Sequence, residues 1–171
     1  LRSFCYFAMV KRYGGVPIIL DPQDPESTPD EEYFPERDTE QAVYDQVIAD
    51  AQLAFDLLPD RWVGQKGRAG RWAAKAMESR AALYAGSIAK YGTVQLDGLL
   101  GIDNAMQDDY YQLALDASTL LIEEGGYTLF NNYADPTENY TRLFLDETED
   151  ETIFMKIWIP YEKGHSYDLR N

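Results

Sequence analysis

Two segments decide how this chain folds: Tyr13-Gly14-Gly15-Val16-Pro17-Ile18-Ile19-Leu20 and Gly70-Arg71-Trp72-Ala73-Ala74-Lys75-Ala76. The first predicts the end of a helix, because paired glycines supply a left-handed stop and the following proline prevents the helix from continuing. An apolar, extended stretch then follows at residues 16–20. The second segment predicts the start of an alanine-rich helix, whose small side chains let neighbouring helix backbones approach closely.

Apolar residues at helical spacing continue outward from these two segments. We expect a helix at the start of the chain and further helices over about residues 38–58, 71–91 and 108–124. In the first helix Cys5 is predicted to be buried, and Asp38 with Gln41 suits a capping box for the second. The predicted inner stripe of the third helix consists of Ala74, Met77, Ala81, Tyr84, Ile88 and Tyr91.

The remaining stretches are predicted to be loops or short extended segments. Residues 21–37 hold four prolines and seven acidic side chains, which indicates a long surface loop. A calcium site is conceivable there, but the spacing matches no known calcium loop, so a solvated loop is the better interpretation. Residues 127–130 are expected to be extended. Residues 153–159 alternate in the manner of a strand, which Pro160 closes.

Composition limits the classes of partner. The 171 residues are 45% hydrophobic and carry a formal charge of −15, so we expect a globular chain that repels nucleic acid. A neutral ligand or a protein is the expected partner. The one cysteine allows no internal disulfide, and no apolar run approaches the ~20 residues that span a bilayer. Arg2-Ser3-Phe4 does not suit a lipid-anchor signal before Cys5.

The expected fold class is mainly α, with tetratricopeptide-like antiparallel helix pairs, a few short strands and long loops. A faint internal period supports the pairs, since Ala51 and Tyr84 lie 33 residues apart at comparable predicted inner positions. Generic antiparallel helix packing is the alternative. We expect residues 1–171 to form a single domain that is a fragment of a longer chain, or else a cleaved mature form.

Five loose motifs in one order resemble the SusD/RagB family of outer-membrane nutrient-binding lipoproteins of Bacteroidetes. They are the Tyr-Gly-Gly-Val-Pro turn at 13–17, the helix ending in Leu58-Pro59, Gly70-Arg71 through Ala73-Ala74 to Leu83-Tyr84, Gly126-Tyr127-Thr128-Leu129, and Leu143-Phe144 with Asp150-Glu151-Thr152-Ile153-Phe154. Thr152 departs from the pattern, because an aliphatic residue is commoner there in the family.

The resemblance implies a role in nutrient uptake. Family members are non-catalytic and need no cofactor. They sit on the outer membrane as surface lipoproteins and act as lids of a SusC-like, TonB-dependent transporter, holding oligosaccharide or, in some cases, peptide. Members are also considerably longer than this chain. The lipid anchor, the only expected link to the membrane, and the signal peptide would lie outside these residues.

Candidate ligand contacts come from loop aromatics, because sugars present apolar faces and hydroxyls together. Trp62, beside Arg61 and Gln65, meets that need in the loop after Pro59. Further along the chain, the expected contacts are Tyr161, His165 and Tyr167. His165 has no second ligand that would make it a metal site.

Two other functions remain open from the residues. A glycoside hydrolase needs two carboxylates at a defined separation, whereas the acidic run at 146–151 is expected to be a solvated turn. A helical-repeat scaffold that binds only protein would use the same helices. A peptide-binding, RagB-like lid is the nearest variant of the glycan-binding role.

Overall fold

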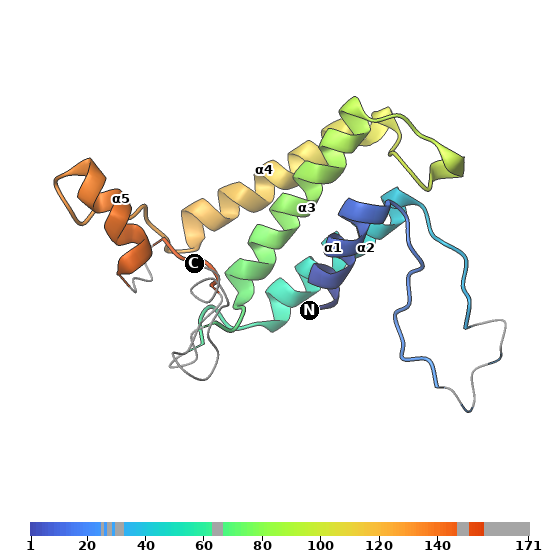
Figure 1. Ribbon diagram of the computed structural model, residues 1–171, viewed down its shortest axis with the longest axis horizontal. Coiled ribbons are helices and arrows are strands. Elements are labelled where there is room, and N and C mark those ends of the chain that lie inside the picture. The colour runs from blue at the N-terminus through green and yellow to red at the C-terminus, as the bar shows by residue number, and fades with distance from the viewer. Residues whose placement is uncertain (25, 27–28, 30–32, 63–66, 147–150, 156–171) are drawn as a thin grey trace, which may run out of the picture.

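The computed structural model describes residues 1–24, 26, 29, 33–62, 67–146 and 151–155. Five α-helices organise these residues (Figure 1): α1 (Arg2–Tyr13), α2 (Glu40–Leu57), α3 (Arg71–Tyr91), α4 (Gln107–Glu124) and α5 (Pro136–Leu145). Two 3-10 turns, η2 (Leu96–Gly98) and η3 (Asn104–Met106), lie between α3 and α4. The predicted bounds of α3 are confirmed, and those of α4 are within one residue.

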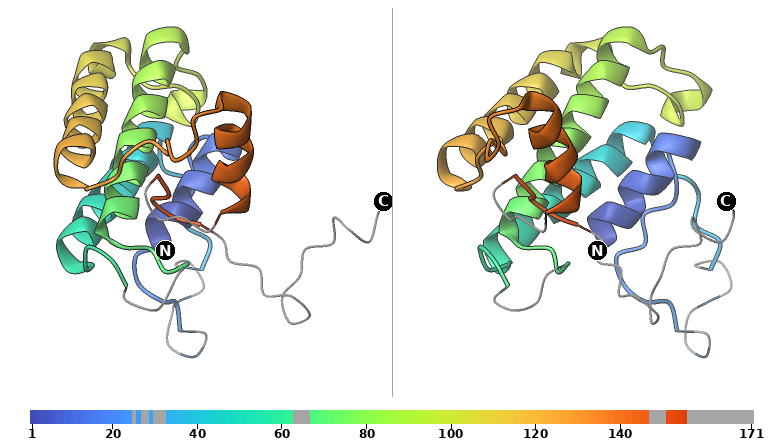
Figure 2. Two further views of the ribbon diagram at one scale, coloured as in Figure 1. Left: turned by 90° about the vertical axis from the view of Figure 1, so that its left-hand side faces the viewer. Right: turned by 60° about the vertical axis from the view of Figure 1, so that its left-hand side comes forward.

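The first four helices pack as a stack of antiparallel neighbours. Each of them contacts the next one along the chain, with α3 between α2 and α4 (Figures 1 and 2). This is the predicted mainly α, tetratricopeptide-like class. Helix α5 stands apart from the stack, beyond the end of α4. None of the described helices combines the length and apolar composition needed to cross a bilayer.

The Gly14–Gly15 turn is a crossing point of three segments. Gly14 has a φ of 67° and ends α1, as the sequence predicts. The N–H of Gly15 donates to the carbonyl of Leu99 at 2.8 Å, and a Cβ on Gly15 would lie 1.9 Å from the carbonyl oxygen of Asp38. The turn therefore joins the end of α1 to the start of α2 and to the loop after α3.

The start of α2 differs from the predicted capping box. The N-cap is Thr39, whose hydroxyl accepts a hydrogen bond from the N–H of Ala42. Asp38 instead accepts from the N–H of Ile18 at 2.7 Å and so holds the extended segment after the Gly-Gly turn. Asp38 and Thr39 are both suitable N-cap residues. Because Asp38 bonds to Ile18, Thr39 is the one that caps the helix.

The buried face of α1 is not the one that its apolar spacing indicates. Ser3, Tyr6, Phe7 and Val10 are buried, whereas Cys5 is exposed, so its predicted burial is wrong. Polar atoms on the inner face explain the difference. Ser3 donates to the carbonyl of Val47 at 2.9 Å, and the Tyr6 hydroxyl bonds both the N–H and the carbonyl of Ile19.

The predicted stripe on α3 is only partly buried. Tyr91 is 75% exposed and does not fill space between helices, whereas Tyr84, at 45% exposed, packs edge-to-face on Phe7 of α1 with 5.4 Å between ring centroids. Ala51 and Tyr84 are therefore not equivalent inner positions. Ala74 and Ala81 of the predicted stripe are buried, and the other buried small residues are Ala82, Ala85, Gly86 and Ala89. A helix packed between two neighbours needs its small side chains where the backbones approach, and larger ones are displaced to the edges.

The predicted strand at residues 153–159 is not present in its described part. Residues 151–155 are irregular, and residues 156–159 lie outside the described residues. The described part of this segment forms no backbone ladder with residues 127–130. It is joined to them by the Glu151 carboxylate, which accepts a hydrogen bond from the N–H of Phe130 at 2.8 Å. Across the described part of the chain, β pairing is limited to an isolated bridge between Gln95 and Leu100.

Helix α5 was not predicted, although its sequence holds a start signal. The Asp135 side chain accepts from the N–H of Glu138 at 3.0 Å, and Pro136 occupies the first turn. An acidic N-cap followed by proline is a recognised helix start. The helix buries none of its residues.

Candidate functional site

The loop between α2 and α3 is fixed at its base. The N–H of Arg71 donates to the carbonyl of Pro59 at 2.9 Å, and its guanidinium donates to the carbonyl of Phe55 at 3.2 Å. A Cβ at Gly70 would lie 2.6 Å from the carbonyl oxygen of Asp60. The Gly-Arg pair therefore closes the end of α2 onto the start of α3, and residues 60–62 and 67–69 project from this closure.

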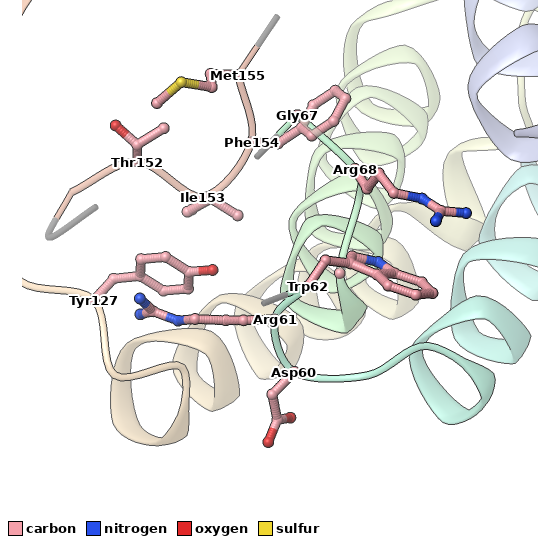
Figure 3. Close-up of a pocket in the computed structure, with 11 residues that line it drawn as sticks. Asp60, Arg61, Trp62, Gly67, Arg68, Tyr127, Thr152, Ile153, Phe154 and Met155 are labelled. Atoms are coloured by element: carbon pink, nitrogen blue, oxygen red, sulfur yellow. The ribbon is translucent and has the colours of Figure 1, made fainter. Parts of the chain in front are cut away.

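Trp62 lies at the edge of a small hollow formed by this loop (Figure 3). Its indole N–H donates to the carbonyl of Ala69 at 2.9 Å, and the guanidinium of Arg68 covers the ring at 4.2 Å from the centroid. The indole is half-buried. Hydrogen bond and cation–π contact together hold the ring in one orientation.

Tyr127 lies on the opposite side of the same hollow. The guanidinium of Arg61 is 4.8 Å from the centre of the Tyr127 ring, and Figure 3 shows the two side chains stacked below Thr152 and Ile153. Phe154 and Met155 complete the described lining. The cavity measures about 90 Å³. We refer to it as the Trp62 hollow.

The Trp62 hollow contains one of the four predicted ligand contacts. Tyr161, His165 and Tyr167 lie outside the described residues. Sequence reasoning did not select Tyr127 as a site residue. Tyr127 enters the sequence analysis only as part of the segment that follows a helix. Trp62 and Tyr127 are far apart in the sequence, so no local pattern predicts that they lie close together.

A second, larger hollow of about 400 Å³ lies along α5. Its apolar wall contains Leu129, Phe130, Tyr133, Tyr140 and Leu143, and we call it the α5 hollow. Residues 129–133 are held against the helix by the Asn139 side chain. That amide accepts from the N–H groups of Asn132 and Tyr133 and donates to the carbonyl of Phe130.

The described ends of the acidic run have structural partners in this region. The Tyr133 hydroxyl donates to Asp146 at 2.8 Å, a bond that raises the pKa of the tyrosine. Glu151 accepts from Phe130. These carboxylates are therefore more than the solvated turn that the sequence predicts. Among the described residues, no group of His, Cys, Asp and Glu side chains is arranged to hold a metal ion.

The fold and these hollows define a class: a stack of antiparallel helices with aromatic and polar loops at one end. A family model described as SusD-like, starch-binding and associating with the outer membrane matches residues 1–83. The crystal structure of a SusD-like protein from Bacteroides fragilis is 26% identical, with a TM-score of 0.67 over 93% of this chain. Over residues 1–83 the chain is therefore similar to the SusD-like family, and the likeness in fold to SusD-like structures extends over most of its length.

Another similar structure was crystallised with a xylogluco-oligosaccharide. It is 25% identical to this chain, with a TM-score of 0.62 over 93% of it. The chain spans 26% of the Bacteroides fragilis protein and 28% of the xylogluco-oligosaccharide complex, so it corresponds to about a quarter of such a protein. A comparison with curated protein sequences finds no match.

Proposed function

We propose that this chain is part of a non-catalytic, cell-surface protein that captures oligosaccharide for a SusC-like, TonB-dependent transporter. The observation that carries the proposal is the Trp62 hollow, which combines aromatic rings with guanidinium groups at a loop edge. The match of residues 1–83 to the SusD-like family model and the similar structure crystallised with a xylogluco-oligosaccharide support it. Attachment to the outer membrane through a lipid anchor outside these residues is part of the same proposal.

Neutral glycan suits the charge of the molecule. The chain carries −15 overall, which disfavours acidic ligands at long range, while a neutral sugar is unaffected. The ring of Trp62 provides an apolar surface for a sugar face, and the polar groups around it suit hydroxyls. Tyr161, His165 and Tyr167 are proposed as further contacts from the segment that follows residue 155.

Substitution of Trp62 tests the proposal. In the full-length protein, Trp62→Ala should weaken binding of the recognised oligosaccharide about tenfold in calorimetric titration, which is about 1.4 kcal/mol. Trp62→Phe, which keeps an aromatic face but loses the bond to Ala69, should retain part of the affinity. Tyr91→Ala is the matched control, because Tyr91 is an exposed aromatic that lines neither hollow.

The alternative functions give different results in the same assays. An unchanged dissociation constant in a folded Trp62→Ala protein would remove this residue from the site. Saturable binding of peptide and not of glycan would favour a RagB-like lid. Release of reducing sugar by the pure protein would identify a hydrolase. Capture of the transporter with no response to glycan or peptide panels would favour a scaffold.

A further inference from the structure

The two hollows border the same pair of segments. Tyr127 lines the Trp62 hollow, and Leu129 and Phe130, two and three residues later, line the α5 hollow. On the other segment Thr152 lines the first hollow and its neighbour Glu151 lines the second. Consecutive Cα atoms are about 3.8 Å apart, so each segment passes from one hollow to the other within about two residues. The hollows are therefore adjacent.

A bond between the two segments holds this border together. The Glu151 carboxylate accepts the N–H of Phe130 at 2.8 Å, at the point where both segments enter the α5 hollow. A carboxylate has about four acceptor positions, so the same group can also accept from a ligand hydroxyl. The contact thus supplies both a fixed floor and a polar group between the hollows.

The α5 hollow has the chemistry of a sugar subsite. Tyr140 is 68% exposed and presents a ring whose edge-to-face neighbour, Phe144, lies 5.3 Å away between centroids. Leu129 is exposed beside it. An aromatic face and an aliphatic side chain suit an apolar sugar face, while the Tyr140 hydroxyl and Glu151 suit its hydroxyl groups. The volume of about 400 Å³ falls in the range of small-ligand sites.

We infer that the α5 hollow is a second subsite, and that one oligosaccharide extends from the Trp62 hollow across residues 127–130 and 151–152 onto Tyr140. This inference rests on the proposed function. It adds that recognition depends on the length of the sugar chain. A short oligosaccharide occupies the Trp62 hollow alone, and a longer one also contacts α5.

A length series tests the inference. For the full-length protein, affinities for a disaccharide through to a hexasaccharide of the recognised linkage are measured by calorimetry. Affinity should rise with length in the wild type. Tyr140→Ala should weaken hexasaccharide binding about tenfold and leave the disaccharide unchanged, whereas Trp62→Ala should weaken both. Tyr140→Phe should keep most of the affinity, because it retains the ring.

Two controls separate this inference from the proposed function. Tyr91→Ala should bind every length as the wild type does. Because Tyr140 is largely exposed, Tyr140→Ala should also leave the thermal unfolding transition near that of the wild type. If the wild type binds oligosaccharide and Tyr140→Ala prefers long chains as strongly as the wild type does, the second subsite is wrong and the proposed function remains intact. Wild-type protein that binds no oligosaccharide would overturn both.

Discussion

Single residues in the two diagnostic motifs have structural roles. Gly14 needs its positive φ, and Gly15 needs its missing side chain, because the carbonyl of Asp38 occupies the space of a Cβ. Gly70 is crowded in the same way by Asp60. Arg71 caps the carbonyl of Phe55 at the end of α2. These residues hold chain crossings in place, so both motifs serve the structure of the helical stack.

Replacement of Gly15 by alanine should destabilise the fold by about 3 kcal/mol, since the added methyl group meets backbone and not a flexible side chain. Urea unfolding measures the loss. Gly126→Ala is the control, because Gly126 has a φ of 67° but no atom within 4 Å of its ideal Cβ. Its expected cost is about 1 kcal/mol from backbone strain alone. Equal losses in the two variants would argue against crowding as the cause.

At the scale of elements, α2 and α3 share a buried polar cluster. Lys75 and Glu78 form an ion pair of 2.6 Å on α3, and the Gln52 amide of α2 donates to Glu78 at 2.9 Å. The Lys75 ammonium also lies 4.4 Å from the centre of the Phe55 ring. Sequence periodicity placed no charge in this interface, because it identifies only apolar stripes.

Removing one charge of this cluster should destabilise the fold more than replacing both charges with apolar side chains. Glu78→Ala should lower the free energy of unfolding by about 3 kcal/mol, because it leaves the buried Lys75 ammonium without its partner. The double variant Lys75→Met with Glu78→Leu should lose considerably less. A double-mutant cycle from urea unfolding measures the difference. Additive losses would show that the two charges do not stabilise one another.

At the scale of the whole molecule, two carboxyl groups respond to pH with opposite signs. The bidentate Arg2 guanidinium, with bonds of 2.6 and 2.7 Å, lowers the pKa of Asp50 below its ordinary 3.8 and links α1 to α2. Burial raises the pKa of Glu40 above its ordinary 4.5, opposed by the bond that it accepts from the N–H of Gly101. Both groups join separate parts of the stack.

The signs lead to a pH prediction. The folded state binds a proton at Asp50 less tightly than the unfolded state, so this contribution is present above about pH 4 and is lost as the pH falls further. Asp50→Asn should therefore cost at most about 1 kcal/mol at neutral pH, because the Arg2 side chain is partly exposed and solvent screens the pair, and it should flatten the acid limb of the stability curve. Urea unfolding across the acid range measures it.

Glu40 supplies the matched comparison. Its contribution is present at acid pH and is lost as the pH rises through its raised pKa, so Glu40→Gln should flatten the limb above about pH 4.5 instead. If both variants flatten the same limb, the assignment of the two groups is wrong.

The sequence by itself determined the helices of the stack, because a helix end depends on local residues such as Gly14 and Gly92 and a helix body on spacing within a few turns. It also determined the fold class, and its motifs carry the resemblance to the SusD/RagB family. Local patterns predicted the wrong buried face for α1 and only part of the buried face of α3, because that choice depends on neighbouring helices.

Only the tertiary structure decided where the candidate site lies. Trp62 and Tyr127 come from segments with the whole of α3 and α4 between them, and Glu151 meets Phe130 across α5. No short-range signal encodes such meetings, since they result from the packing of the helices between them. The types of residue in the loop after Pro59 thus indicated an aromatic, polar site. The packing of the helices places that loop next to the α5 hollow.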